Sequence, residues 1–388
     1  MGHRVTIVTS KYNYLTAAEK QDSERQSFAS GIDVRLAPTL GGLHRSYLSR
    51  VFVFLSFMFS SVAIALWLNN VDIVLGTSPP IFQAVSAWIA AAIRRRPFVL
   101  EVRDLWPEFA IDLGLLQSRC LIALARQIEE FLYNRAHLII VNSPAYRIHL
   151  AEKGIPEGKV CIIANGVDVS MFDPDQNGRS FRREHGLCEK IVVMYAGALG
   201  FANPLDTLLH AALRLRDQPE IVLVIVGCGK EATRLRRESD AMSLHNVRFV
   251  PAQPKARIPE ILAAADICVA TPKNVPMFQT TYPNKVFDYM AAGRPTVLAI
   301  DGVIREVIEN SRGGLFVPPE DDDPLAMRYS HCTTRLDCAR NWVRTPGGML
   351  KSTSTATHRL ANLPPCLKGA ASPEVNSDRA YLPDELGD

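Results

Sequence analysis

The sequence predicts an α/β protein with two doubly wound parallel sheets. Short apolar runs rich in β-branched residues alternate with longer amphipathic helical patterns as far as about Val317. Runs that are apolar throughout are typical of strands buried on both faces, as in parallel sheets covered by helices. A polar stretch at 165–190 interrupts the series, and a length of 388 residues fits two domains of about 150 residues each with an appendage.

The first half of the chain contains six predicted strands. We expect the third of them to lie in the same sheet as the first. The six runs are Arg4–Thr9, Ile32–Leu36, Val71–Gly76, Phe98–Val102, His137–Val141 and Lys159–Ile163.

The second half repeats the pattern with six further runs. Helical patterns such as Cys120–Asn134 and Pro204–Arg216 separate most strands in both halves. The runs are Ile191–Ala196, Ile221–Val226, Val247–Val250, Ile267–Ala270, Thr296–Ala299 and Gly314–Val317.

These patterns set the expected domain boundaries. We expect a first domain at 1–166, a linker at 167–188, a second domain at 189–324 and a tail at 325–388. The tail shows no sustained helical or strand period and is studded with Pro, Gly, Ser and Thr. We therefore expect it to be poorly ordered.

One run, Val51–Leu68, is apolar enough to suggest a membrane. As a helix it would span about 27 Å, which is marginal against the roughly 20 residues that a bilayer crossing needs. A crossing would also place the flanking strands on opposite sides of the membrane. Two alternatives stay open: a buried crossover helix, or a helix lying in the bilayer interface, where His44, Arg45 and Arg50 would suit anionic headgroups.

Composition excludes several classes of protein. A formal net charge of +3 is too small to favour nucleic acid as the main partner. A hydrophobic fraction of 47% excludes disorder for most of the chain. The cysteines form no CxxC pair and no metal-ligand spacing, which favours reduced thiols in a cytosolic compartment. They are Cys120, Cys161, Cys188, Cys228, Cys268, Cys332, Cys338 and Cys366.

The segment TTYPNKVFDYMAAGRPTVLA carries the first candidate site. A helix is expected from Asn284, directly after a proline, so Asn284 and Lys285 lie in a first turn where free N–H groups favour an anion. Asp288 is three residues further and shares that face. A cation for a diphosphate and a carboxylate for two vicinal hydroxyls suit a nucleotide sugar. The alternative is a Lys–Asp pair on a solvated helix face.

Two glycine-bearing loops should converge on the same place. One begins at Gly197, after the first strand of the second half, and the other contains Gly227, Gly229 and Lys230. Ligands bind outside the carboxyl ends of strands in open α/β sheets, and glycines there let a phosphate approach the backbone. Neither loop is a full GxGxxG, so a tight structural turn is an equal alternative for each. Lys230 could also be a simple exposed lysine at a helix start.

The motif EVRDLWPE is the candidate site of the first half. A predicted strand runs directly into Arg103 and Asp104, and the pair is expected to face the same crevice from the opposite domain. Asp104 could act as a base or hydrogen-bond partner for an acceptor hydroxyl, and Arg103 could contact phosphate. The alternative is an Arg–Asp ion pair that supports the loop.

Together these residues resemble the glycosyltransferases of the GT-B fold. More narrowly, they resemble family 4, in the bacterial branch that transfers N-acetylated amino sugars during O-antigen or capsule synthesis. The matching stretches follow the family order across about residues 2–324. They are SFMFS, TSPP, EVRDLWPE, VNSP, IIANGVD, YAGALG, IVGCG, YPNKVFDYMAAGRP and DGVIREVIENSRGGLFVPPED.

The resemblance implies two Rossmann-like domains that face a crevice, with a nucleotide-sugar donor held mainly by the second domain. It implies retention of anomeric configuration, with no cofactor and usually no metal. Asp288 takes the place of the second acid of an E-x7-E signature, which holds the ribose, whereas the first acid would fall at Thr280. Lys285, with Lys230 second, is the candidate to neutralise the diphosphate, and Glu306 matches a further family acid.

The absence of an acidic pair at a strand end also favours a metal-independent reaction. The only DxD is Asp173-Pro174-Asp175, which lies in the expected linker, and Asp321–Asp323 is a charge run in a loop. Neither follows an apolar strand, so we predict no metal site.

Both ends depart from the family pattern. Family members begin with a strand, a glycine-bearing loop and a helix before the segment that starts here at Gly2, and they finish with helices that this tail does not resemble. An incomplete or frame-shifted gene model explains both departures. The alternative is that both ends are genuine and the protein is inactive.

Three functions follow from these observations. The leading one is transfer of an amino sugar from a UDP-type donor to a lipid-linked or growing surface polysaccharide, by a cytoplasmic enzyme peripheral to the inner membrane. The alternatives are a non-catalytic relative that still binds nucleotide and a nucleotide-sugar epimerase of the same fold.

Overall fold

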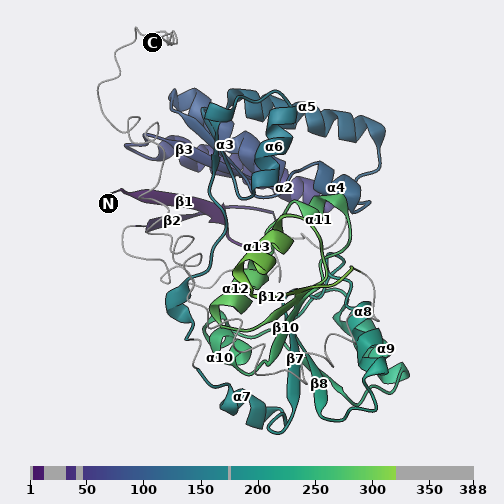
Figure 1. The fold of residues 1–388 in the computed structure, drawn as a ribbon. Helices are drawn as coiled ribbons and strands as arrows, with labels where there is room; N and C mark the ends of the chain where they lie inside the picture. The colour runs from purple at the N-terminus through teal and green to yellow at the C-terminus, as the bar shows by residue number, and fades with distance from the viewer. Residues whose placement is uncertain (1–2, 13–31, 41–46, 174–175, 320–388) are drawn as a thin grey trace, which may run out of the picture. The chain divides into compact units, whose positions relative to one another are not determined.

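The computed structural model describes residues 3–12, 32–40, 47–173 and 176–319. These residues form two compact units, shown as one ribbon in Figure 1. The described part of the first unit lies within 3–102 and 128–140, and that of the second comprises 103–127 and 141–319. The predicted tail at 325–388 and the basic residues His44 and Arg45 lie outside the described residues, and the domain boundaries stay a prediction.

The first unit contains two separate parallel strand pairs. β1 (Val5–Ser10) pairs with β2 (Ile32–Ala37), and β3 (Val74–Ser78) pairs with β4 (Phe98–Val102). β3 and β4 belong to a four-stranded sheet with the order β3-β4-β5-β6, which β1 and β2 do not join.

The expectation that β1 and β3 share one sheet is therefore wrong. Strands join a sheet only through a hydrogen-bonded neighbour, and no described strand pairs with the free edge of β1 or of β3. β3 also begins at Val74, three residues later than the apolar run that predicted it. The apolar run was a poor guide to the start because hydropathy alone does not mark where pairing begins.

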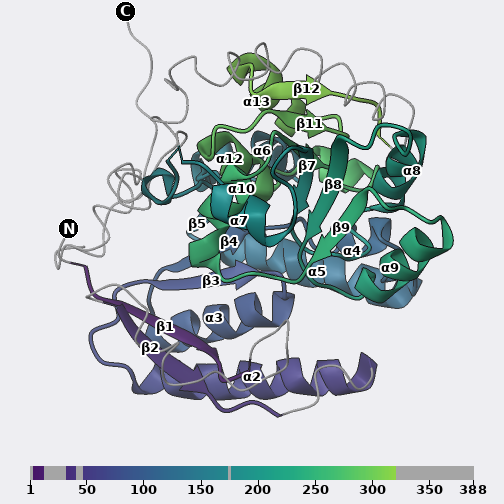
Figure 2. The same ribbon diagram turned by 90° about the horizontal axis from the view of Figure 1, so that it is seen from below.

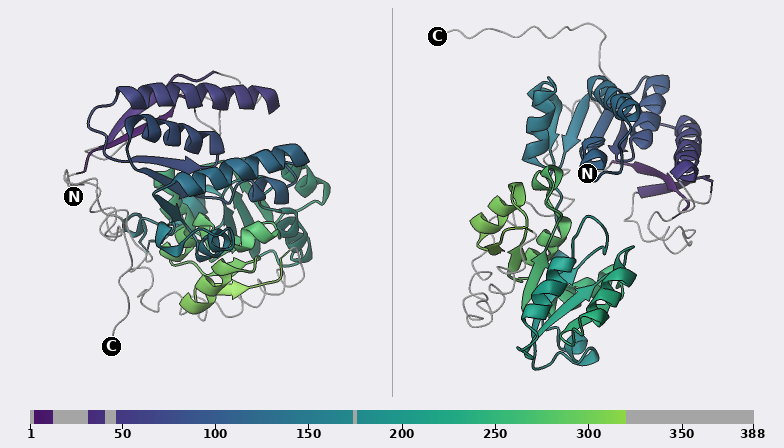
Figure 3. Two further views of the ribbon diagram at one scale, coloured as in Figure 1. Left: turned by 90° about the horizontal axis from the view of Figure 1, so that it is seen from above. Right: turned by 90° about the vertical axis from the view of Figure 1, so that its right-hand side faces the viewer.

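The apolar segment forms α2 (Tyr47–Trp67), which packs beside α3 (Ile81–Arg94) as Figure 3 shows. Phe54 of α2 stacks on Phe82 of α3 at 6.1 Å between ring centroids. The Arg94 guanidinium donates to the last carbonyl groups of α2, on Ala65 and Leu66, at 3.1 and 2.8 Å. It thus satisfies acceptors that a helix end leaves without partners.

α2 is only partly buried. It contacts β1 and β2 on one side, as a crossover helix should. On another side Phe52, Phe59 and Trp67 are 61, 69 and 87% exposed. Within the residues that the structure describes, no helix has both the length and the apolarity that a membrane span requires.

The remaining elements of the first half carry the EVRDLWPE and NSP motifs. The strand β4 leads into the loop at 103–107, and β5 leads into α6, whose N-cap Ser143 accepts from the N–H of Ala145 at 3.2 Å. The elements are α4 (Glu108–Asp112), α5 (Arg119–Arg135), β5 (Leu138–Val141), α6 (Pro144–Glu152) and β6 (Val160–Ile162).

The second unit holds a six-stranded parallel sheet with the order β12-β11-β10-β7-β8-β9. Ile191 of β7 lies opposite Ile221 of β8, and the two strands stay paired over their full length. All six predicted runs form strands here, with ends that move by at most one residue. The strands are β7 (Ile191–Ala196), β8 (Ile221–Val226), β9 (Val247–Val250), β10 (Ile267–Ala270), β11 (Thr296–Leu298) and β12 (Gly314–Phe316).

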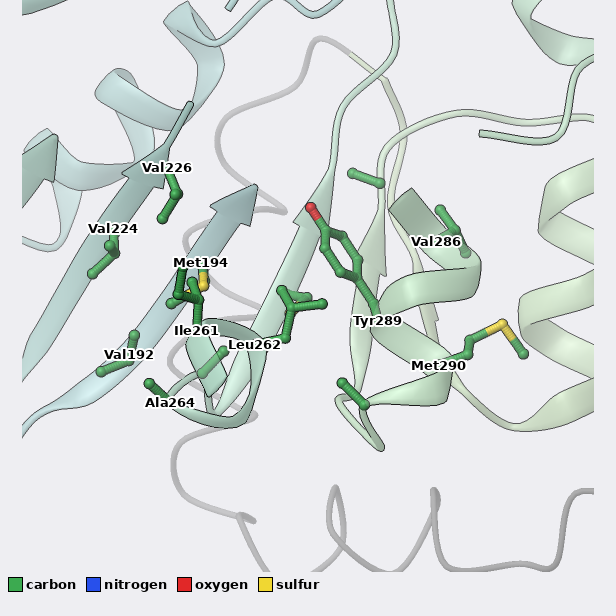
Figure 4. Close-up of a cluster of buried hydrophobic side chains, with 14 of the residues drawn as sticks. Val192, Met194, Val224, Val226, Ile261, Leu262, Ala264, Val286, Tyr289 and Met290 are labelled. Atoms are coloured by element: carbon green, nitrogen blue, oxygen red, sulfur yellow. The ribbon is translucent and has the colours of Figure 1, made fainter. Parts of the chain in front are cut away.

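Helices cover both faces of this sheet, as Figure 2 shows for β7, β8 and β9. Alternate strand residues point to opposite faces, so Val192 and Met194 join one core while Val193 and Tyr195 join the other. Figure 4 shows the first core, which α10 and α12 cover. The helices are α7 (Arg179–Glu184), α8 (Asp206–Arg214), α9 (Ala232–Ala241), α10 (Ile258–Ala263), α11 (Pro276–Gln279), α12 (Asn284–Ala291) and α13 (Val303–Ser311).

The expected linker at 167–188 contributes to that core. α7 lies within it, and its Phe181 is fully buried among the residues of the first core. The neighbouring Arg182 forms an ion pair with Asp266 at 2.6 Å, where the chain enters β10. The polar composition of the segment gave no indication that Phe181 would be buried in the core.

Candidate functional site

The two glycine-bearing loops pack directly on each other at the carboxyl ends of β7 and β8. A Cβ atom at Gly227 would lie 1.9 Å from the carbonyl oxygen of Gly197, and one at Gly229 would lie 2.0 Å from that of Leu199. These distances leave no space for a side chain at either position. The glycines are therefore required by close packing between the loops, as the structural-turn alternative predicts.

Lys285 of α12 reaches this loop pair. Its Nζ donates to the hydroxyl oxygen of Tyr195 and to Oδ1 of Asn203, each at 2.8 Å. It also lies 4.3 Å from the centroid of the Tyr195 ring. A Cβ atom at Gly197 would come within 3.2 Å of Nζ. Thus the structure brings the predicted cation and the predicted loops together.

Burial lowers the pKa of the Lys285 amine to about 7. No carboxylate neutralises it among the described residues, since both of its hydrogen-bond partners are uncharged. A desolvated ammonium without a counter-ion favours its neutral form. An anionic ligand at this position would restore the charge, so the site suits a phosphate group.

Asp288 lies one turn further along α12 and is half-buried. Burial raises its pKa to about 6, and the positive charge of Lys255 opposes the rise. In the described part of the chain Asp288 forms no ion pair with Lys285. The alternative of a solvated Lys–Asp pair is therefore wrong, because burial shifts both groups and they have different neighbours.

Two tyrosines fix the geometry around Lys285. The Tyr289 hydroxyl donates to the carbonyl of Ala196 and accepts from its N–H, both at 3.0 Å, and Figure 4 shows its ring rising from α12 toward the sheet. The Tyr195 hydroxyl donates to the carbonyl of Ala198 at 2.8 Å. The sequence analysis missed both, although Tyr289 lies four residues after Lys285 and so on the same side of the helix.

The loop after β4 places Asp104 in a partly buried position. Burial raises the pKa of its carboxyl group, and the charge of Arg103 opposes the rise. Arg103 itself is exposed, and its carbonyl accepts from Nδ2 of Asn142 at 2.8 Å. The described residues contain no ion pair between Arg103 and Asp104, so a charge pair does not support this loop.

The same region contacts the segment before α12, and all of it lies within the second compact unit. The Ser143 hydroxyl donates to the carbonyl of Thr280 at 2.5 Å, and the N–H of Met277 donates to Asp112 at 3.2 Å. Phe109 packs edge-to-face on Phe278 with centroids 5.5 Å apart. The start of α6, the end of α4 and α11 thus pack together within the second unit.

A cavity of about 650 Å³ opens beside this assembly. Thr280, Gly302 and Glu306 line it together with the first turn of α13. The carboxylate of Glu306 also contributes to a raised pKa of Tyr282, after burial, so these two side chains are close. Glu306 therefore lies near Thr280, where the first acid of the family signature would fall.

Two candidates gain no further support. Lys230 is exposed ahead of α9, which agrees with its interpretation as a solvated lysine, and Asn284 is exposed at the start of α12. Among the described residues no cluster of three or more His, Cys, Asp or Glu side chains could hold a metal ion. Metal independence stays a prediction.

The fold and the site can now be compared with known proteins. Residues 1–166 match the family described as "Glycosyl transferase 4-like domain", and residues 190–334 match "Glycosyl transferases group 1". Each half of the chain thus matches one glycosyltransferase domain family. The fold of the protein is GT-B, as its structural neighbours show.

The curated relatives cover only part of the chain. WcaI of Escherichia coli, a putative colanic acid biosynthesis glycosyl transferase, is 24% identical over 59% of this chain and 58% of its own length. D-inositol 3-phosphate glycosyltransferase of Salinispora arenicola is 26% identical over 50% of this chain and 49% of its own length. The chain thus spans about half the length of these relatives.

Solved structures agree with the fold. Anabaena HepE in complex with UDP-glucose has a TM-score of 0.72 and 18% identity, and the match covers 94% of this chain and all of that one. Sucrose-phosphate synthase of Thermosynechococcus elongatus has a TM-score of 0.75 and 17% identity, with 95 and 90% covered. At these identities the likeness shows the fold alone.

Proposed function

We propose that this chain transfers an N-acetylated amino sugar from a UDP-linked donor to a lipid-linked or growing surface polysaccharide, with retention and without a metal. The observation that carries the proposal is the Lys285 amine, held by two uncharged partners beside the paired glycine loops. Within the part of the chain that the structure describes, it is a cation site without a counter-ion, at the carboxyl ends of parallel strands, where ligands of α/β folds bind.

The diphosphate of the donor supplies the missing negative charge. Lys285 would bind it as an ammonium, and the free N–H groups at the start of α12 would add partial positive charge. Gly197 has no side chain of its own, and a Cβ atom there would lie 3.2 Å from the Lys285 Nζ, so the loop backbone and the amine would contact the diphosphate together. This arrangement neutralises a leaving diphosphate with protein groups and needs no cation from solution.

The ribose of the donor would bind at Asp288. A carboxylate accepts hydrogen bonds only, so two vicinal hydroxyls can each donate to one of its oxygens. Lys255 is close enough to influence the charge of Asp288 and keeps the carboxylate anionic near neutral pH. The ribose and the diphosphate would then contact α12 one turn apart.

The acceptor hydroxyl would react at the side of Asp104. In a retaining transfer, the bond from the anomeric carbon to the diphosphate breaks while a bond to the acceptor oxygen forms on the same face. The hydroxyl proton passes to the leaving diphosphate, whose remaining negative charge Lys285 neutralises. Asp104 and Arg103 would orient the hydroxyl and the phosphate, respectively.

Further observations support a UDP-linked donor and an acceptor at the membrane surface. HepE, which shares the fold, was crystallised with UDP-glucose, and WcaI is named for colanic acid biosynthesis. The exposed residues Phe52, Phe59 and Trp67 on α2 give an apolar surface suited to the bilayer interface. A lipid-linked acceptor at the inner face of the membrane would fit that surface.

One observation favours a second candidate, a relative that binds nucleotide without transferring sugar. Among the described strands, β1 and β2 do not join the four-stranded sheet, so strand edges in the first unit are left unpaired. The six-stranded sheet of the second unit packs against α12, which carries Lys285 and Asp288. Nucleotide binding would therefore persist where transfer is lost.

Calorimetry on the full chain tests the proposal. UDP-N-acetylglucosamine should bind, and Lys285→Met and Asp288→Asn should each weaken binding about tenfold or more, since each removes a charged partner. Lys190→Met is the matched control and should bind as the unmodified chain does, because Lys190 precedes β7 at the opposite end of the strand from Gly197. Transfer to a lipid-linked acceptor then separates the two candidates, and binding without turnover would select the second. A folded chain that binds no nucleotide would overturn both.

A further inference from the structure

Asn203 holds the Lys285 amine with a neutral oxygen atom. Its Oδ1 atom accepts from Nζ of Lys285 at 2.8 Å, and its Nδ2 atom donates to the carbonyl of Ala198 at 3.2 Å. The reversed amide would place two donors against each other and two carbonyl oxygens against each other, so these neighbours fix the amide orientation. The side chain of Asn203 is therefore an uncharged acceptor aimed at the amine.

The loop backbone holds Asn203 in place. The N–H of Asn203 donates to the carbonyl of Gly200 at 2.9 Å, which closes a tight turn. The carbonyl of the preceding residue, Ala202, accepts from the N–H of Lys273 at 2.9 Å, so the turn is tied to the segment that follows β10. Because the turn is fixed at both points, Asn203 is preorganised to hold the amine.

The Lys285 amine keeps one position for a ligand. Tyr195 and Asn203 accept two of the three hydrogens of the ammonium form, and no other described residue accepts from Nζ. The third hydrogen, or the lone pair of the neutral amine, is left unused. A Cβ atom at Gly197 would lie 3.2 Å from Nζ, so the space beside this glycine adjoins the amine. Gly197, Asn203 and Lys285 are all partly exposed, so a solute can reach that space.

The titratable groups around the amine supply no opposite charge to it. Burial raises the pKa of the Tyr195 and Tyr289 phenols and of the Cys268 thiol near Tyr289, so all three stay uncharged at neutral pH. Asp288, on the same helix, has a pKa of about 6 and is already ionised above pH 7. Of this set, Lys285 is therefore the group whose charge changes between pH 7.5 and 8.5, since burial lowers its pKa to about 7.

We propose that Asn203 is a positioning residue for the nucleotide-sugar donor. Its neutral oxygen keeps the Lys285 amine beside Gly197 without neutralising it, so the amine becomes fully charged only when a phosphate oxygen of the donor arrives. A carboxylate at position 203 would instead hold a permanent ammonium and repel the diphosphate. The inference rests on the proposed donor site and adds the residue that controls the charge of its cation.

The affinity for UDP at two pH values tests this role on the full chain. In the unmodified chain the affinity should fall about eightfold from pH 7.5 to 8.5, because binding takes up a proton at an amine with a pKa of about 7. Asn203→Asp should bind UDP about tenfold or more weakly at pH 7.5, with nearly the same affinity at pH 8.5. Asn203→Ala adds no charge, so it should lose affinity only a few-fold and keep the pH dependence.

The comparison of these two variants separates positioning from a merely structural role. A structural role would lower the melting temperature and the affinity in both variants and leave the pH dependence in both. Asn310→Asp is the matched control, because it adds the same charge at an exposed position in the last turn of α13. It should bind UDP as the unmodified chain does at both pH values. The inference is overturned if Asn203→Asp keeps the pH dependence of the unmodified chain.

A measurement on the apoprotein separates this inference from the proposed function. If the unmodified chain binds neither UDP nor UDP-N-acetylglucosamine, the proposed function fails. The pKa of Lys285 can still be measured from the pH dependence of its acetylation by acetic anhydride, followed by mass spectrometry. Asn203→Asp should raise that pKa well above its value of about 7, since the new carboxylate would contact the ammonium. An unchanged pKa contradicts the inference, whether or not the chain binds a nucleotide.

Discussion

The amine of Lys285 donates to the hydroxyl oxygen of Tyr195 at 2.8 Å while lying 4.3 Å from the centroid of the same ring. One tyrosine thus contacts the cation through both its oxygen and its ring. Burial lowers the pKa of the amine to about 7, so the apoprotein holds a group that is ready to gain a proton when an anion arrives.

Donor binding should therefore take up a proton. Above pH 7 the apo Lys285 amine is mostly neutral, and the diphosphate draws it back to the ammonium form. We expect uptake approaching one proton per UDP-N-acetylglucosamine at pH 8.5, from Lys285, and net proton release at pH 5.5, where Asp288 must ionise to accept from the ribose. Calorimetry in buffers with different ionisation enthalpies measures this directly. Equal uptake in Lys285→Met would assign the proton to another group.

Asp288 should make stability depend on pH in the opposite sense from an ordinary surface carboxylate. Burial raises its folded pKa to about 6 from a usual value of 3.8, so the folded chain binds the proton more tightly. Its contribution to stability is full below pH 3.8 and is lost as pH rises through 6. Asp288→Asn should therefore stabilise the apoprotein at pH 7.5 and by much less at pH 4.5.

Chemical denaturation at the two pH values measures this difference. Asp240→Asn, at an exposed position of α9, is the control and should show no such pH-dependent gain. A gain from Asp288→Asn that is equal at both pH values would contradict a raised pKa.

The paired glycine loops should tolerate no side chain. In Gly227→Ala the new methyl group would lie 1.9 Å from the carbonyl oxygen of Gly197, so one loop must move. We expect loss of nucleotide affinity by tenfold or more together with a lower melting temperature. Gly158→Ala is the control, because no atom lies within 4 Å of its new methyl group. Undiminished nucleotide affinity in Gly227→Ala would show that the loop geometry does not matter for binding.

The six-stranded sheet of the second unit was predictable from the sequence. The two sheets formed by the first half of the chain were predictable only in part. Strands such as Ile221–Val226 are apolar throughout because both faces are covered, so their pattern marks them clearly. Strand pairing depends on which strands are neighbours in space. The apolar patterns of β1 and β3 do not show that the two strands lie in separate sheets.

The residues of the candidate site were predictable where they lie close together in the sequence. Lys285 and Asp288 lie within one short motif, and the strand ends marked Gly197 and Gly227 in advance. Tyr195 could not be found in this way, because its hydrogen bond to Lys285 joins residues that are 90 positions apart in the sequence. The same holds for Phe181, a single apolar residue in a polar segment whose burial depends on α10 and the sheet.

Phe181 should nevertheless be essential for stability. Its side chain is fully buried in the first core of the second unit, and truncation to alanine would leave a large cavity. Phe181→Ala should lower the free energy of unfolding by about 3–5 kcal/mol. Phe201→Ala removes the same atoms from a side chain that is 70% exposed and should cost far less. Denaturant unfolding of both variants measures the contrast, and equal losses would contradict the core role of α7.

The exposed face of α2 should determine membrane association. Phe52, Phe59 and Trp67 recur at helical spacing, so they lie along one side of α2. Replacing all three by serine should reduce binding to vesicles of anionic lipid at least tenfold, because several large apolar side chains would no longer enter the interface. The folded state should persist, since these side chains contribute little to the core.

A matched triple variant makes that result specific. Leu115, Ile148 and Phe201 are 68, 62 and 70% exposed and lie outside the first unit, so replacing them by serine removes comparable apolar surface elsewhere. Its vesicle binding should equal that of the unmodified chain in a sedimentation assay. Equal loss in both triple variants would mean that general hydrophobicity governs association. No binding by the unmodified chain would remove the membrane from the proposed function and leave the nucleotide site unaffected.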